Sequence, residues 1–216
     1  MEKLFAIGDI HGCYLQLVKL MERLAFDARH DTLVFLGDYI NRGPQSRQVI
    51  DFLLQVKSTC PRSVFLMGNH EHLLLSYAAT GDVEILHNLR GMGAEETLKS
   101  YDHAPVRSLL DLSFLPPAHL EFFRSLQVSF RWGPYLFVHA DEAEENSSEA
   151  HLGEVLASRR LVKECQLLEG CVRVFGHSPL ETPLVAPDRI GIDTGAAHGN
   201  LLTAVELPAL RFYHAG

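Results

Sequence analysis

Five short apolar runs, each ending at a polar signature, constrain the fold of this chain more than any other feature. The first three, at residues 4–7, 33–36 and 64–67, are continuous, have the length of a strand and are each followed by glycine. Between them, apolar residues recur at helical spacing over 15–24 and 49–56. This alternation predicts a βαβαβ unit with a parallel sheet.

The rest of the chain predicts further helices and then a strand-rich half. Residues 71–125 have mostly helical patterns, and Pro116-Pro117 opens the last of these helices. Strands are expected at residues 127–131, 135–139, 172–175, 189–193 and 201–207. The two halves predict an α/β fold in which two β-sheets pack face to face as a β-sandwich flanked by helices. A length of 216 residues fits a single domain, 1–216.

Composition excludes several classes of partner. A formal charge of -8 argues against nucleic acid, because binding to a phosphate backbone needs a clustered basic face. No stretch approaches the roughly 18 apolar residues of a membrane span, and the first apolar run meets Asp9 too early for a signal peptide. Four cysteines without a Cys-x-x-Cys pair suit a reducing compartment. We therefore expect a cytoplasmic protein with no nucleic-acid or membrane partner, and the oligomeric state stays open.

A polar signature follows each of the five runs, at the end of the strand where an open α/β sheet places its ligands. Glycines let the chain turn sharply there, so that the next polar side chain points into a common crevice. The signatures are Gly8-Asp9-Ile10-His11-Gly12, Gly37-Asp38-Tyr39-Ile40-Asn41-Arg42-Gly43, Gly68-Asn69-His70-Glu71, Phe137-Val138-His139 and Phe175-Gly176-His177. The sequence therefore predicts one polar site shared by five strands.

Six residues of these signatures form a mixed set of oxygen and imidazole ligands. They are Asp9, His11, Asp38, Asn69, His139 and His177. Such a set suits manganese, iron or zinc better than magnesium, which prefers oxygen ligands. We expect two divalent metal ions here, with manganese first among them, in a centre that hydrolyses its substrate.

Taken in order, the motifs GDxHG, GDxxxRG, GNHE and two isolated histidines resemble the phosphoprotein phosphatase (PPP-type) family of calcineurin-like metallophosphoesterases. The likeness covers residues 5–199 and is nearest to the small bacterial serine/threonine protein phosphatases. Two further matches are Gly12-Cys13-Tyr14 and Ile192-Asp193-Thr194-Gly195-Ala196. The resemblance implies the metallophosphatase-type arrangement, α/β/β/α, and hydrolysis of phosphoric esters.

The resemblance implies a role for each matching ligand. Asp9 and His11 would bind one metal ion, and Asp38 would bridge it to a second. The coordination of the second ion would be completed by Asn69, His139 and His177. Two such ions, about 3.5–4 Å apart, activate a water molecule and hold phosphoryl oxygens for in-line attack.

Two arginines that bind phosphate are also implied by the resemblance. Arg42 in the GDxxxRG motif matches the first, because a guanidinium pairs with phosphate as a bidentate fork. The second belongs to a Leu-Trp-x-Arg segment, which Leu156-Ala157-Ser158-Arg159 matches except at the tryptophan. We take Arg159 as the candidate, and Arg160 stays open as the alternative.

His70 would be the general acid that protonates the leaving oxygen. The aspartate that pairs with this histidine in the family is Asn41 here, which can orient the ring but cannot stabilise an imidazolium by charge. We therefore expect a weaker proton donor, whether the asparagine is natural or engineered. Bacterial diadenosine tetraphosphate hydrolases also lack an aspartate at this position, which keeps a nucleotide substrate open.

Two acidic features have more than one interpretation. After His139 the family usually continues with Ala-Gly, but this chain has Ala140-Asp141 and several glutamates up to Glu149. We favour a solvated acidic loop, and the alternative is a loop that borders the metals and shapes substrate entry. Glu71 is either catalytic or a carboxylate that supports the site or begins a helix.

The sequence thus predicts a metallophosphatase. Its leading form is a bacterial protein phosphatase that acts on phosphoserine or phosphothreonine, with phosphotyrosine as a further substrate, through a hydroxide activated by two metal ions. The partner would be a phosphorylated protein or a small phosphoester. One alternative is a dinucleoside polyphosphatase similar to the symmetrical diadenosine tetraphosphate hydrolases. Another is a catalytically weakened member that holds metal and binds a phosphorylated ligand.

Overall fold

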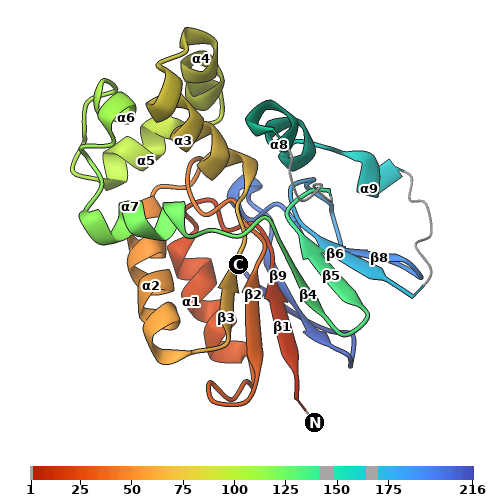
Figure 1. Cartoon of the computed structure of the whole chain (residues 1–216). Coiled ribbons are helices and arrows are strands. Elements are labelled where there is room, and N and C mark those ends of the chain that lie inside the picture. Colours follow the sequence, from red (N-terminus) through yellow and green to blue (C-terminus); the bar gives the residue numbers. More distant parts are fainter. Residues whose placement is uncertain (1, 142–147, 164–169) are drawn as a thin grey trace.

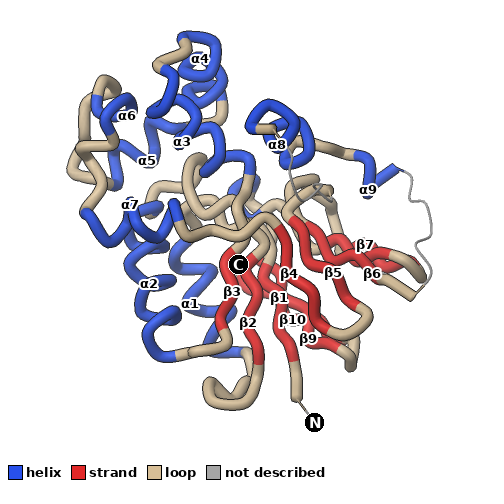
Figure 2. Tube along the Cα trace, in the orientation of Figure 1, coloured by secondary structure: helices blue, strands red, loops and turns tan. Residues whose placement is uncertain are grey.

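The first β-sheet contains strands from both ends of the chain (Figure 2). In the computed structural model, which describes residues 2–141, 148–163 and 170–216, its strand order is β10-β9-β1-β2-β3. The strands β1, β2 and β3 are parallel, and β9 and β10 are added antiparallel on the free edge of β1. Their bounds are β1 Leu4–Ile7, β2 Thr32–Phe35, β3 Ser63–Phe65, β9 Leu202–Leu207 and β10 Arg211–Ala215.

The second β-sheet has the strand order β4-β5-β6-β8-β7. Its central strands β5, β6 and β8 are parallel, and the edge strands β4 and β7 are antiparallel to their neighbours. The bounds are β4 Ser129–Trp132, β5 Tyr135–Val138, β6 Val172–Phe175, β7 Leu184–Ala186 and β8 Arg189–Gly191. Parallel central strands place the carboxyl ends of β5 and β6 at one edge of this sheet.

Helices cover the first sheet and extend beyond it. Figure 1 shows α1 and α2 beside the first sheet, α3 to α6 grouped further up on the same side, and α8 and α9 near the second sheet. None of the helices within the described ranges is both long and apolar enough to cross a membrane. Their bounds are α1 Tyr14–Arg23, α2 Ser46–Thr59, α3 Asn69–Thr80, α4 Val83–Gly91, α5 Ala94–Ser100, α6 Ser108–Asp111, α7 Pro117–Arg124, α8 Glu149–Leu156, α9 Arg160–Lys163 and the short 3-10 helix η1 Ala196–His198.

Apolar cores lie on both faces of the first sheet because successive residues of a strand point to opposite faces of a sheet. In β1, Leu4 and Ala6 belong to the core between the two sheets, which also contains Phe137 of β5. Phe5 and Ile7 belong to the core between the first sheet and the helices. All four residues of β1 are fully buried. The continuous apolar run at residues 4–7 thus reflects burial on both faces.

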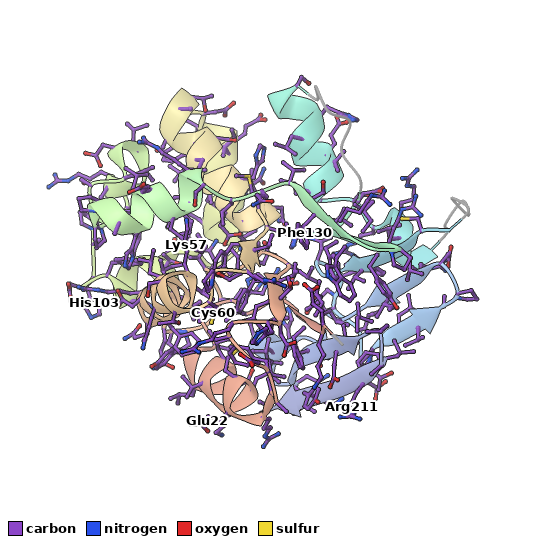
Figure 3. The ribbon with its side chains drawn as sticks, turned by 60° about the horizontal axis from the view of Figure 1, so that its bottom comes forward. Glu22, Lys57, Cys60, His103, Phe130 and Arg211 are labelled. Atoms are coloured by element: carbon purple, nitrogen blue, oxygen red, sulfur yellow. The ribbon has the colours of Figure 1, made fainter. Side chains whose placement is uncertain are left out.

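Helix α7 ties the group of further helices to the layer that covers the first sheet. The ammonium group of Lys57 in α2, labelled in Figure 3, lies 5.9 Å from the centroid of the Phe122 ring and 3.0 Å from Ser125 Oγ. His119 Nε2 of α7 lies 3.0 Å from Asp51 Oδ1 of α2. These contacts fix the position of the helices that follow β3.

The predicted α/β sandwich is confirmed. The strand-rich half of the chain, however, contributes strands to both sheets and not to the second sheet alone. β9 and β10 join the first sheet, where β9 pairs with β1 from Leu4 opposite Leu207 to Ile7 opposite Ala204. The physical reason is the free edge of β1, because a strand buried on both faces needs hydrogen-bond partners on both edges. The strands β7 and β10 were not predicted.

Candidate metal centre

The ends of five strands converge on one polar cluster. The residues that follow β1, β2, β3, β5 and β6 are, in that order, Asp9 with His11, Asp38, Asn69, His139 and His177. Five of the six are buried and His177 is half-buried. Contacts of 3.5 Å or less connect them in series, from His11 through Asp38, His139, Asn69 and His177 to Asp9. The structure therefore brings all six predicted ligands together.

Asp38 stands between two groups of potential ligands. Its Oδ2 lies 3.4 Å from His11 Nε2, and its Oδ1 lies 3.5 Å from His139 Nε2. Ligand atoms of His11, Asp38 and His70 lie within 4.8 Å of one another, and so do those of Asp38, His139 and His177. A carboxylate that faces two groups with its two oxygens can bridge two metal ions.

The ring nitrogens that face this cluster carry lone pairs. His11 Nδ1 donates to the Ile40 carbonyl at 3.0 Å, and His139 Nδ1 donates to the Leu36 carbonyl at 2.8 Å. The neutral rings then present Nε2 as an acceptor. Nε2 of His139 faces Asn69 Oδ1 at 3.1 Å, so that two acceptors meet without a proton between them. A cation satisfies both atoms, and the residues fit a metal ion.

Three buried carboxyl groups, those of Asp9, Asp38 and Asp193, lie in the cluster. Burial, Asp193 and Asp38 raise the pKa of Asp9 well above its ordinary value, and burial raises the pKa of Asp38 to about 7. Asp193 Oδ1 accepts from the Gly195 N–H at 2.9 Å, whereas its Oδ2 has no hydrogen-bond partner within the described part of the chain. A divalent cation would favour the ionised carboxylates and so reverse these shifts.

The histidines of the cluster are neutral at pH 7. Burial is the largest cause in each case: it lowers the pKa of His11 and His70 well below the ordinary value, that of His139 to about 4 and that of His177 to about 3. Neutral imidazole is the form that binds a metal ion. The four rings are therefore in the form of ligands.

Backbone strain accompanies the turns that aim these side chains. His11, Asp38 and His177 adopt the left-handed conformation, with φ of 45°, 53° and 63°. For a residue with a side chain this conformation costs on the order of 1 kcal/mol, and such strain gathers at functional sites. Gly68 lies so close to Asp38 that a Cβ there would be 2.1 Å from Asp38 Oδ1. The glycine after β3 is thus required by the packing of the second signature.

Glu71 holds the loop after β2. Its buried carboxylate accepts backbone N–H groups of Asp38, Tyr39, Ile40 and Gly68 at 2.9, 2.8, 3.3 and 3.1 Å. Burial and Asp38 raise the pKa of Glu71 to about 8, whereas three of these N–H groups lower it, and four donors facing two oxygens favour the ionised carboxylate. The structure therefore favours the supporting interpretation of Glu71 over the catalytic one.

His70 is oriented by Asn41, as the sequence predicts. Asn41 Nδ2 lies 2.9 Å from His70 Nδ1, and the Thr97 hydroxyl donates to Asn41 Oδ1 at 2.7 Å. With its oxygen taken by Thr97, the amide donates to Nδ1, and the ring proton lies on Nε2, 3.7 Å from Asp38 Oδ2. Thr97 was missed by the sequence analysis because it lies in α5, in a segment without a motif.

Arg42 lies inside the cluster. Its Nη1 is 2.6 Å from His11 Nε2, which accepts the hydrogen bond. Burial raises the pKa of Asp9 and Asp38, and the charge of Arg42 acts in the opposite direction on both. This arginine therefore borders the first ligand group.

The two candidates for the second arginine have different surroundings. The pKa of His177 is lowered mainly by burial and His139, and the charge of Arg159 adds to this lowering. Arg160 instead forms a fork with Asp141, from Nε and Nη2, with both distances 2.8 Å. Arg159 is thus the member of the pair whose charge acts on the cluster.

Asp141 is buried, so the predicted solvated loop is wrong at this residue. Its side chain is paired with Arg160 and accepts from Ser158 Oγ at 3.2 Å. Burial is possible because an opposite charge and further hydrogen bonds replace water. The glutamates at positions 142, 144 and 145 lie outside the described residues.

A two-sheet sandwich with oxygen and imidazole ligands at five strand ends defines a metallophosphoesterase, an enzyme that hydrolyses phosphoric esters with divalent metal ions. The chain belongs to the calcineurin-like phosphoesterase family, whose model matches residues 3–195. The predicted family and enzyme class are thereby confirmed. The fold of this family implies divalent ions, and the ligand groups that share Asp38 fit them.

Relatives of this chain are named for two kinds of substrate. Serine/threonine-protein phosphatase 1 of Salmonella typhimurium is 31% identical over 94% of this chain and 91% of its own length. The asymmetrical bis(5'-nucleosyl)-tetraphosphatase PrpE of Anoxybacillus flavithermus is 27% identical over 94% of this chain and 90% of its own length. A symmetrical bis(5'-nucleosyl)-tetraphosphatase of Dechloromonas aromatica is 38% identical over 63% of this chain and 42% of its own length.

Solved structures with the same fold include a tetraphosphatase and a protein phosphatase by name. A putative diadenosine tetraphosphatase has a TM-score of 0.70 and 21% identity, and the match covers 99% of this chain and 92% of that structure. A cold-active protein tyrosine phosphatase has a TM-score of 0.70 and 18% identity, and the match covers 98% and 75%. At these identities the likeness establishes the fold.

Proposed function

We propose that this chain is a dinuclear metal-dependent phosphomonoesterase of the cytoplasm that removes phosphate from phosphoserine or phosphothreonine in proteins. The observation that supports it most is the position of Asp38, whose two oxygens face two separate ligand groups. The similarity to a serine/threonine-protein phosphatase over nearly the full length of both chains supports a phosphoprotein substrate.

In this proposal the six clustered side chains hold the metal. One ion would be held by Asp9, His11 and Asp38, and the other by Asp38 together with Asn69, His139 and His177. Divalent ions at such a centre supply hydroxide at neutral pH and Lewis-acid stabilisation of the phosphoryl group. Manganese is the ion we propose, and iron and zinc suit the same ligands.

Two arginines would hold the phosphoryl group at the proposed centre. Arg42 borders His11 of the first ligand group, and Arg159 acts on His177 of the second. Each guanidinium can donate two parallel hydrogen bonds to phosphoryl oxygens. This arrangement fixes the phosphorus between the groups and lowers the entropy cost of in-line attack.

His70 donates the proton that the leaving serine or threonine oxygen requires. Its Nε2 carries the proton and faces Asp38, while Asn41 holds Nδ1. A neutral imidazole is a much weaker acid than an imidazolium, so proton transfer is less effective than with an aspartate at position 41. Leaving groups that need little protonation should therefore react best.

A dinucleoside polyphosphatase is the second candidate, and Asn41 is the observation that favours it. Cleavage of a phosphoanhydride expels a phosphate, which needs less protonation than an alkoxide, so a weak acid at His70 is less costly there. The similarity to the tetraphosphatase PrpE over nearly the whole chain agrees with this candidate.

Product analysis separates the two candidates. Metal-stripped protein loaded with manganese is given a phosphoserine peptide or diadenosine tetraphosphate, and Asp38→Asn serves as the inactive control. Inorganic phosphate from the peptide, with little nucleotide cleavage, supports the phosphoprotein assignment. Rapid release of nucleotides without peptide turnover contradicts it and supports the second candidate. Tight binding of the peptide without turnover identifies a binding protein.

A further inference from the structure

Asp141 forms an ionic contact that connects the end of β5 to the turn between α8 and α9. It lies two residues after His139, and its side chain is 6% exposed. Oδ2 accepts from Arg160 Nε and Oδ1 accepts from Arg160 Nη2, both at 2.8 Å, and Ser158 Oγ donates to Oδ2 at 3.2 Å. A planar guanidinium fork on a carboxylate fixes direction as well as distance.

Arg159 stands between the two residues that Asp141 holds. Ser158 and Arg160 also contact each other, because Ser158 Oγ accepts from the Arg160 N–H at 3.2 Å. On the preceding side, the backbone of Ala157 is hydrogen-bonded to the His177 ring. The turn at residues 157–160 is therefore attached at one point to the end of β6 and at two points to the end of β5.

These attachments hold the backbone on both sides of Arg159. Its neighbours on both sides contact Asp141, two residues after His139, and the backbone of Ala157 contacts the His177 ring. A free arginine side chain has many rotamers to lose, and a mobile backbone would add to the cost of holding it at a phosphate. Fixing the turn beforehand lowers that cost.

We propose that Asp141 is a positioning residue: through Arg160 and Ser158 it holds the turn that presents Arg159 to a phosphoryl group at the metal centre. The inference rests on the proposed function, because Arg159 acts on phosphate only there. In this role Asp141 acts through Arg160 and Ser158, which its oxygens contact. Pairing also screens the carboxylate, which would otherwise repel an anionic substrate.

Four single variants and one double variant test this role. Arg159→Gln removes the proposed phosphate ligand, Asp141→Asn and Arg160→Gln release the turn from its two sides, and Asp188→Asn is the matched control. Asp188 has the same 6% exposure and contacts Arg189 at 3.2 Å, but it precedes β8, at the opposite end of the second sheet from His177.

The expected result is a loss that depends on Arg159. Arg159→Gln should lower kcat/KM for p-nitrophenyl phosphate by about 10–100-fold, as expected for a lost charged hydrogen bond. Asp141→Asn and Arg160→Gln should each lower it about tenfold, mostly through KM. In the double variant, adding Asp141→Asn to Arg159→Gln should change kcat/KM by less than about twofold, because contacts that act through one residue are not additive. Asp188→Asn should leave it unchanged.

Phosphate affinity and thermal unfolding distinguish a positioning role from a loss of folding and from an incorrect assignment of function. Inorganic phosphate affinity, measured by calorimetry on manganese-loaded protein, should follow the same non-additive pattern. Thermal unfolding shows whether a variant is folded, and Arg160→Gln, an exposed side chain, keeps the test valid if Asp141→Asn is unstable. The inference is overturned if the effects of Asp141→Asn and Arg159→Gln are fully additive in both readouts. It is also overturned if Asp141→Asn and Arg160→Gln leave KM and phosphate affinity unchanged. If the variants change phosphate affinity in this non-additive pattern but the wild type hydrolyses no ester, only the proposed function is overturned.

Discussion

Asn41 controls the chemistry of His70 through the direction of one amide. Because the Thr97 hydroxyl donates to Asn41 Oδ1, the amide nitrogen donates to His70 Nδ1. A carboxylate at position 41 would accept from Nδ1 instead and would stabilise the protonated ring. One side chain therefore decides between a neutral and a charged proton donor.

Asn41→Asp should accelerate hydrolysis of an alkyl phosphate by up to roughly a hundredfold, the range of general acid catalysis. Hydrolysis of p-nitrophenyl phosphate should change far less, because its leaving group scarcely needs a proton. Steady-state rates on both substrates with one preparation check this. Equal gains, or no gain on either, would contradict the role of position 41.

At the scale of elements, Glu71 joins the start of α3 to the loop after β2. Four backbone N–H groups converge on its carboxylate, including that of Asp38. This contact explains why a glutamate follows Gly68-Asn69-His70 in the first turn of the helix. The geometry of the bridging ligand depends on it.

Glu71→Gln should lower the free energy of unfolding by about 1–3 kcal/mol, because the amide NH2 group cannot accept the N–H groups that it faces. Urea denaturation of the metal-free protein measures the change. Glu95→Gln, which removes an exposed pair with Arg90, is the control and should cost at most about 1 kcal/mol. An equal loss of unfolding free energy in the two variants would show that the Glu71 hydrogen bonds stabilise the fold no more than an exposed ion pair does.

The strands that end in motifs were predictable because burial on both faces leaves continuous apolar runs, as at residues 4–7. The short edge strand β7 and the half-exposed β10 carry no such run, so their pairing depends on tertiary contacts. Thr97 and the Asp141 fork were hidden for another reason. Their partners are 56 and 19 residues away, and neither spacing has a periodic signal.

At the scale of the whole molecule, the metal-free fold encloses carboxyl groups that burial keeps protonated. The folded pKa of Asp38 is about 7 against 3.8 as its ordinary value, so the folded state binds its proton more tightly than the unfolded state does. Its contribution to stability is therefore lost as pH rises from about 4 to about 7. The histidines with lowered pKa act in the opposite direction over part of this range.

A comparison of Asp38→Asn with the wild type measures this contribution together with the effect of Asp38 on Asp9 and Glu71, whose pKa values it raises and which change stability in the same direction. In the presence of a chelator, the stability of the variant relative to the wild type should increase as pH rises from about 4 to about 7. Urea denaturation at several pH values measures it. A difference that stays constant with pH would show that Asp38 titrates normally in the fold.

The most direct test of a centre bridged by Asp38 is phosphate release from a phosphoserine peptide while metal-stripped protein is titrated with manganese. Bound metal per chain is measured on the same samples. The account predicts that activity appears as the second ion binds and that Asp38→Asn releases no phosphate at any metal concentration. Full activity with one ion per chain, or activity retained in Asp38→Asn, would contradict a dinuclear centre.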